Sequence, residues 1–282
     1  MFKLSYTTLS LTLLLSACTN AEPPAAPEPE AVKATTTAVA PALPSKLLTI
    51  VESTDEALVP SPTETQRALQ AAGIDAELAK LIENRDLDVT NQNLDNAAVR
   101  TGVIIADLLL SAKTADKASL IARLEKINTG LSQLKGGKDI DVTITDLQQR
   151  IEADAVSNIE LIKELEELSN ALIPELTFQG QKEIIPLIQA GSWLEGANLV
   201  AKAIRATGNP AAADAMLKQP AVVSYFIRYV NTEGKEKAPA PITKILDASL
   251  QNLKTLAEKK EPFTLQDLDT VINTTNNVLA LL

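Results

Sequence analysis

The feature that most constrains this chain is the spacing of its apolar residues, which recur at intervals of three and four over most of its length. One such series runs through 120–134 and another through 161–168. This spacing places apolar side chains on one face of an α-helix, whereas a half-buried strand would alternate. Only 140–144 comes near to alternation. The pattern therefore predicts an all-α helical bundle over residues 46–282.

Composition excludes several kinds of chemistry. The chain has no histidine and one cysteine, so it has no histidine-activated nucleophile, no histidine-bound zinc or haem and no internal disulfide. A net charge of −10 and an aromatic content of 3 % are unlike the basic, aromatic surfaces of nucleic-acid binders. Because 45 % of the residues are hydrophobic, the chain can still bury a core. We predict no catalytic residue, no metal site and no nucleic-acid partner.

The first 17 residues have the organisation of a bacterial export signal. Lys3 supplies a positive charge, and Leu9–Leu15 form an apolar segment well below the roughly 20 residues that span a bilayer. The segment ends in Leu15-Ser16-Ala17-Cys18, and Cys18 is the only cysteine. This sequence resembles the lipobox of bacterial lipoproteins, although an ordinary secretory signal or a buried N-terminal strand remains the alternative.

The resemblance to lipoproteins implies cleavage before Cys18, a diacylglycerol on its thiol and an acyl chain on its new amino group. Several acyl chains on one residue anchor a protein stably, and we expect no cofactor besides this covalent lipid. The next residue is Thr19 and not Asp. By resemblance to the sorting rule of Gram-negative enterobacteria, this favours the outer membrane, and we expect the periplasmic face.

Residues 18–45 have the composition of a linker. Prolines recur from Pro23 to Pro44 and large apolar side chains are rare, so the segment cannot bury enough surface to fold. A semi-extended chain of this composition reaches on the order of 80 Å at ~3.1 Å per residue. We expect it to hold the helical domain away from the membrane.

Several helix starts have capping sequences. Thr90, Thr143 and Thr264 each precede Asn or Asp by three residues, with an apolar residue before the threonine, as in a capping box with a hydrophobic staple. Ser61 precedes Pro62 and begins a fourth helix in the same way. Helix ends are predicted at Gly73, Gly136-Gly137 and Gly208.

The sequence also suggests an internal duplication, with repeats at 90–174 and 178–282 and one extra helix at about 210–230 in the second. Three pairs of windows carry it: 102–113 with 191–202, 126–135 with 245–254, and the starts at Thr143 and Thr264. The alternative is that any two amphipathic helices align passably. A real duplication predicts a pseudo-symmetric bundle with the two glycine-bearing helices central.

Those two glycine-bearing windows carry a second resemblance. Gly102-Val-Ile-Ile-Ala-Asp107-Leu108 and Gly191-Ser-Trp193-Leu-Glu195-Gly196 are similar to paired motifs of uncharacterised all-helical bacterial lipoproteins. The aromatic residues expected just after each motif are missing here. The resemblance supports the fold and implies no activity.

Asp107 is the sharpest candidate for a functional residue because it interrupts an almost wholly apolar stretch. Glu195 lies in the matching helix with Trp193 beside it, so these three residues are candidates for a ligand pocket between the repeat helices. The alternative is that Asp107 and Glu195 lie on solvated or inter-helix faces and that Trp193 belongs to the core.

We therefore expect a membrane-anchored envelope lipoprotein that is not an enzyme. Its predicted role is a protein-interaction or scaffold module with an envelope protein as partner. The competing hypothesis is a module that binds a small polar ligand or a cation near Asp107 and Glu195.

Overall fold

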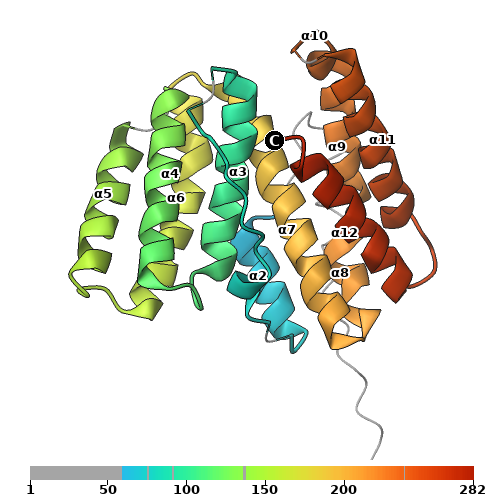
Figure 1. Cartoon of the computed structure of the whole chain (residues 1–282), viewed down its shortest axis with the longest axis horizontal. Coiled ribbons are helices and arrows are strands. Elements are labelled where there is room, and N and C mark those ends of the chain that lie inside the picture. Colours follow the sequence, from blue (N-terminus) through green and yellow to red (C-terminus); the bar gives the residue numbers. More distant parts are fainter. Residues whose placement is uncertain (1–58, 75, 91, 136–137, 238) are drawn as a thin grey trace, which may run out of the picture. The chain divides into compact units, whose positions relative to one another are not determined.

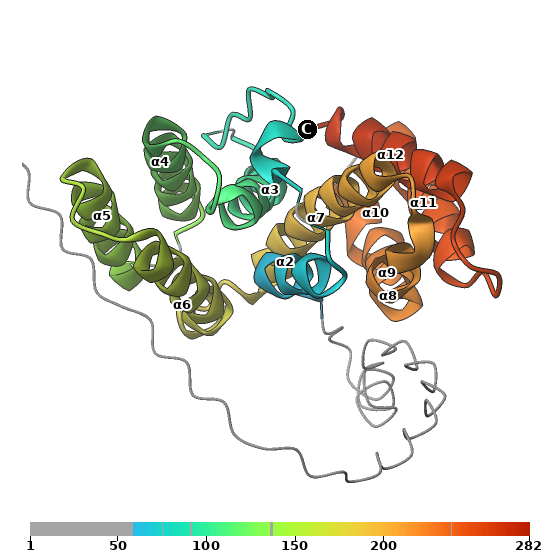
Figure 2. The ribbon, with the colours of Figure 1, turned by 90° about the horizontal axis from the view of Figure 1, so that it is seen from below.

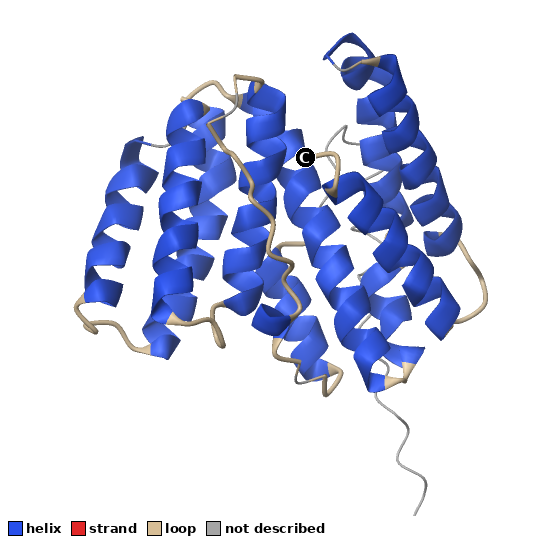
Figure 3. Ribbon diagram, in the orientation of Figure 1, coloured by secondary structure: helices blue, strands red, loops and turns tan. Residues whose placement is uncertain are grey.

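In the computed structural model, residues 59–282 are described except 75, 91, 136–137 and 238. The predicted signal, Cys18, the linker and the first residues of the predicted domain lie outside this part. All of the described residues belong to one compact unit. They form helices and loops, and this part of the chain contains no strand (Figure 3).

The helices of the first half are α2 (Pro62–Ala71), the 3₁₀ turn η1 (Leu78–Lys80), α3 (Leu94–Ser111), α4 (Lys117–Gln133), α5 (Lys138–Glu152) and α6 (Asn158–Phe178). Those of the second half are η2 (Lys182–Ile184), α7 (Ile185–Thr207), η3 (Pro210–Ala212), α8 (Ala213–Leu217), α9 (Pro220–Tyr229), the π-turn η4 (Val230–Gly234), α10 (Lys235–Lys237), α11 (Ala240–Ala257) and α12 (Leu265–Leu279).

Helices α3 and α7 pack against each other at the centre of the bundle. In the first half, α4 packs on α3, α5 on α4 and α6 on α5; in the second, α12 packs on α7, and α11 packs on both α12 and α9. Figures 1 and 2 show α4 and α5 on one side of the α3–α7 pair and α11 and α12 on the other. The predicted all-α helical bundle is confirmed.

The contact between α3 and α7 depends on two glycines. A Cβ on Gly102 would overlap the backbone carbonyl oxygen of Ile188, and a Cβ on Gly191 would overlap that of Val99. Gly102 and Gly191 are 89 residues apart, and so are Val99 and Ile188. The contact is therefore reciprocal, as at a two-fold axis. The two glycine-bearing helices are central and equivalent at this crossing.

The other two windows of the predicted duplication do not occupy equivalent places. Helix α4, which holds 126–133, packs directly on α3, whereas α11, which holds 245–254, packs mainly on α9 and α12. Thr264 caps α12, whereas Thr143 lies inside α5. The proposed repeats therefore share the central helix pair but differ in how the outer helices are arranged.

The capping predictions are confirmed at two of the four sites. The hydroxyl groups of Ser61 and Thr264 accept hydrogen bonds from the backbone N–H groups of Glu64 and Asp267, whose carboxylates accept in return. Thr143 instead donates to a carbonyl one turn back, because α5 begins at Lys138.

At the remaining site, Thr90 was predicted as the N-cap, but it donates to Asp88 in the loop. Asn93 caps α3 in its place, since its side chain reaches the N–H groups of Asp95 and Asn96. Of the predicted helix ends, Gly73 and Gly208 adopt positive φ at the ends of α2 and α7, and Gly136-Gly137 lie outside the described residues.

The predicted extra helix at 210–230 is broken into the short α8 and the longer α9. Helix α8 ends at Leu217 and α9 starts at Pro220, because proline is tolerated only in the first turn of a helix. Beyond Tyr229 the helix continues through the π-turn η4, where Asn231 donates to both the Ile227 carbonyl and the Asp247 carboxylate. Val222, Val223 and Phe226 are buried, so α9 is part of the core.

Candidate functional site

The α3–α7 interface contains a buried acidic pair. Asp107 of α3 is 8 % exposed and Glu195 of α7 is fully buried. They lie five and four residues after the glycines of the crossing, so each helix delivers one carboxyl group to the same part of the interface. Two adjacent buried carboxyl groups cannot both be ionised without a large electrostatic cost.

Arg85 supplies the charge that compensates Glu195. Its guanidinium donates to both carboxylate oxygens of Glu195, with nitrogen–oxygen distances of 2.8 Å. Burial alone would lower the pKa of Arg85, but the hydrogen bonds and the charge of Glu195 outweigh it, so the pKa is raised. A two-pronged geometry of this kind is the strongest arginine–carboxylate arrangement. Arg85 therefore supplies the hydrogen bonds and the positive charge that a carboxylate buried at Glu195 requires.

The surroundings of Asp107 favour the uncharged form of its carboxyl group. Burial raises the pKa of its carboxyl group well above the ordinary value of 3.8, and the charge of Glu195 raises it further, while Arg85 and Arg123 oppose the shift. A hydrogen bond between the two carboxyl groups also raises the pKa of Asp107. Burial and the neighbouring acid therefore both favour the protonated form of Asp107.

The segment that carries Arg85 lies across the central helices and contacts α7. We call residues 82–87 the strap; they lie between η1 and α3, and Figure 1 shows this stretch crossing in front of the central helices. Leu87 is buried, and Glu83 accepts a hydrogen bond of 2.7 Å from Lys202 of α7. Arg85 lies between these two anchors, which hold its guanidinium in place over Glu195.

A pocket of about 280 Å³ lies between the strap, α3 and α4. Its polar lining comes from three elements: Glu83, Asn84 and Arg85 of the strap, Asp107 of α3, and Ser119, Arg123 and Lys126 of α4. Ile82, Leu87 and Ile104 supply apolar walls. The pocket therefore brings charged groups to a site whose base is the buried acid pair.

Three buried polar atoms beside this pocket have no hydrogen-bonding partner among the described residues: Asp107 Oδ1, Arg85 Nε and Arg123 Nη1. Buried polar atoms are almost always paired, because leaving one unpaired costs about 1–3 kcal/mol. One acceptor and two donors thus remain available at one place. A ligand that donates to Asp107 and accepts from the arginines would satisfy all three.

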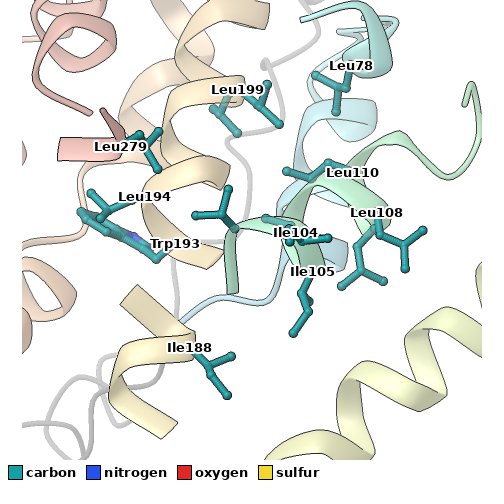
Figure 4. Close-up of a cluster of buried hydrophobic side chains, with 14 of the residues drawn as sticks. Leu78, Ile104, Ile105, Leu108, Leu110, Ile188, Trp193, Leu194, Leu199 and Leu279 are labelled. Carbon is teal, nitrogen blue, oxygen red and sulfur yellow. The ribbon is translucent and has the colours of Figure 1, made fainter. Parts of the chain in front are cut away.

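Asp107 and Glu195 lie together at the interface, but Trp193 is not part of their site. Two residues along a helix turn the side chain by about 200°, so Trp193 and Glu195 lie on opposite faces of α7. Trp193 donates a hydrogen bond of 2.8 Å to Gln219 and packs on Phe226, with ring centroids 5.5 Å apart. Figure 4 shows Trp193 and Leu194 on the side of α7 away from α3. Trp193 is a core residue beside a separate, mainly apolar pocket.

Sequence reasoning missed Arg85, Arg123 and Glu83. No role was predicted for the stretch between Leu81 and the helix start at Thr90. The available signal was indirect: two acids at buried positions require a nearby cation, and Arg85 is the only basic residue between Lys80 and Arg100. Nothing in the spacing of residues indicates that this arginine is folded back onto α7.

Metal and membrane features were also considered within the described residues. No group of three or more acidic or thiol side chains suited to a metal ion occurs in residues 59–282 as far as they are described. In the same part of the chain, no helix combines the length and the apolar character needed to span a bilayer. Cys18, the predicted lipid site, lies outside it.

The chain was also compared with known proteins. No family model matches it, and neither the curated proteins nor the solved structures contain a match. The functional argument therefore depends on the site itself.

Proposed function

We propose that the helical domain is a non-enzymatic binding module whose ligand enters the pocket between the strap, α3 and α4. The observation that carries this proposal is the unpaired Oδ1 of Asp107, a buried acid kept beside an open pocket at a cost to stability. Natural proteins retain such costs mainly where function requires them.

The charges favour a ligand with an anionic group. Glu195 is paired with Arg85 and Glu83 with Lys202, while burial favours the uncharged form of Asp107. Arg123 Nη1 is buried and has no hydrogen-bonding partner among the described residues. We therefore favour a small hydroxy- or amino-carboxylate over the cation that the sequence alone left open. Its carboxylate would accept from the arginines and its donor would reach Asp107.

Small probes test this proposal by NMR titration of the full chain carrying Cys18→Ala. Glycolate offers both a carboxylate and a hydroxyl donor, acetate only the carboxylate, and methylammonium a cation. We expect glycolate to shift the resonances of Arg85 and Arg123 at lower concentration than acetate. Asp107→Leu removes the acceptor, so the affinity for glycolate should fall to that for acetate. Tighter binding of methylammonium than of glycolate would refute an anion site.

We propose further that acylated Cys18 anchors the chain in a bacterial envelope membrane, the outer membrane by preference, with residues 18–45 as the tether. The lipobox-like sequence and the composition of the linker support this. Cys18→Ala should move the protein from the membrane to the soluble fraction of cells. A variant that stays in the membrane fraction through washing with salt would count against the anchor.

Protein interaction remains a second candidate function because of two side chains on α6. Ile159 and Phe178 are 82 % and 84 % exposed, unusual values for large apolar residues. An envelope protein that binds α6 would cover them. Ile159→Ser combined with Phe178→Ser should abolish crosslinking of a partner in intact cells, whereas Val142→Ser, at an exposed apolar residue of α5, should leave it unchanged.

A further inference from the structure

A second, chemically different pocket lies on the other side of α7. It has a volume of about 160 Å³ and is bounded by α7, α9, η4, α11 and α12, with the first turn of α3 at its rim. Its walls are almost entirely apolar, as represented by Leu194, Phe226, Leu246 and Val278. An engineered cavity of about 150 Å³ with similar walls stays dry and binds benzene. The pocket therefore suits an apolar molecule of about the size of one ring.

Tyr229, one of the polar residues of the lining, has a hydroxyl group that is unpaired among the described residues. The oxygen of this group is buried. Tyr229 is the last residue of α9, directly before the π-turn η4. Such π-turns often accompany functional sites, because they reposition side chains on a helix. A buried phenol of this kind is a donor that lacks an acceptor.

The charges around this hydroxyl group determine which acceptor suits it. Asp95 lies on the pocket rim, and the charges of Glu233, Asp95 and Glu183, together with burial as the main cause, raise the pKa of Tyr229. All three acids repel a negative charge placed at the hydroxyl. An anionic head such as a carboxylate is therefore disfavoured, and an uncharged oxygen is not.

We propose that this pocket binds a small, uncharged apolar molecule with one hydrogen-bond acceptor, such as an aromatic ketone, which accepts from the Tyr229 hydroxyl. The proposal is independent of the site at Asp107. It predicts a preference in three respects: size, absence of negative charge, and the presence of one acceptor.

Three matched one-ring probes test these features. Acetophenone has the carbonyl acceptor, isopropylbenzene has a similar size without an acceptor, and benzoate has a negative charge. Binding is followed by NMR titration of the full chain carrying Cys18→Ala. We expect acetophenone to bind more tightly than isopropylbenzene, benzoate not to bind, and the shifted resonances to lie in α9, α11 and α12.

Variants then assign the contact. Tyr229→Phe keeps the ring, so it should weaken acetophenone about 2- to 10-fold, the range of one neutral hydrogen bond, and leave isopropylbenzene unchanged. Leu246→Phe reduces the volume of the pocket and should lower the affinity for both probes. Asp107→Asn should leave both affinities unchanged, which separates this pocket from the one at the strap. Equal acetophenone affinity of the wild type and Tyr229→Phe, binding of benzoate, or no binding of acetophenone would each overturn the proposal.

Discussion

Two parts of the same α3–α7 interface are built on opposite principles. At the glycine crossing, the backbones touch and each helix contributes the same contact to the other. One turn further along, the same helices present Asp107 and Glu195, which need Arg85 from the strap and still leave polar atoms unpaired. The first part is explained by packing alone. The second is not, and this difference identifies it as the candidate site.

The comparison also shows where symmetry ends. The crossing is reciprocal, but Asp107 faces a pocket and burial raises its pKa, whereas Glu195 is covered by Arg85. The two helices thus hold carboxyl groups in different environments, because Arg85 forms its hydrogen bonds with Glu195. The strap, which belongs to neither helix, creates the asymmetry.

Removing the arginine should have the largest effect. Arg85→Met leaves the buried Glu195 carboxylate without its partner, and loss of one member of a buried ion pair costs about 3–5 kcal/mol. Urea denaturation measures this loss in the free energy of unfolding. The exposed Arg67, paired only with Glu166 at the surface, provides the control: Arg67→Met should cost less than about 1 kcal/mol. Similar losses for the two variants would mean that the buried pair is not special.

Adding one methyl group at the crossing should come next. Gly102→Ala or Gly191→Ala forces the two backbones apart, and overpacking of this kind costs about 1–3 kcal/mol. The matched control is Gly196→Ala on the same α7, where no atom outside the neighbouring residues and the backbone of its own helix lies within 4 Å of the new Cβ. That variant should gain up to about 1 kcal/mol from helix propensity. A loss at Gly196 equal to that at Gly191 would show that the crossing is not close.

Asp107→Asn should have a smaller effect of the opposite sign. Above pH 3.8 the unfolded chain ionises Asp107 while the folded chain keeps its proton, so folding requires proton uptake and stability falls as the pH rises towards the folded pKa. Asparagine removes this dependence and keeps the volume. The variant should therefore be more stable than the wild type at pH 7, with a difference that shrinks towards pH 4. Denaturation at both pH values tests this, and a constant difference would contradict it.

A capping variant outside the interface should give the smallest loss in the free energy of unfolding. Thr264→Ala removes the hydroxyl that accepts from Asp267, at a cost of about 1 kcal/mol. Thr143→Ala, in the same sequence pattern but inside α5, should change the free energy of unfolding by less than about 0.5 kcal/mol. Equal losses would show that the pattern, and not the position, determines the effect.

Those two threonines also show how far sequence reasoning reaches. Apolar spacing is a local property, so it predicted the helices, and the two aligned glycine-bearing windows suggested the central pair. The predicted helix start at Thr143 was wrong, because α5 already begins at Lys138. A capping motif alone does not determine where a helix begins. Asp107 and Glu195 could be found because they interrupt apolar stretches. Arg85 and Arg123 could not, because their role depends on where a loop and a third helix lie in space.

The central claim is that burial and the charge of Glu195 hold the pKa of the Asp107 carboxyl group well above its ordinary value. The most direct measurement is the side-chain carboxyl ¹³C chemical shift of Asp107 as a function of pH, in the full chain carrying Cys18→Ala. The structure predicts a transition well above the ordinary value of 3.8, moved to lower pH in Glu195→Gln because the neighbouring charge is lost. A transition at or below 3.8, or one that Glu195→Gln leaves in place, would contradict the account.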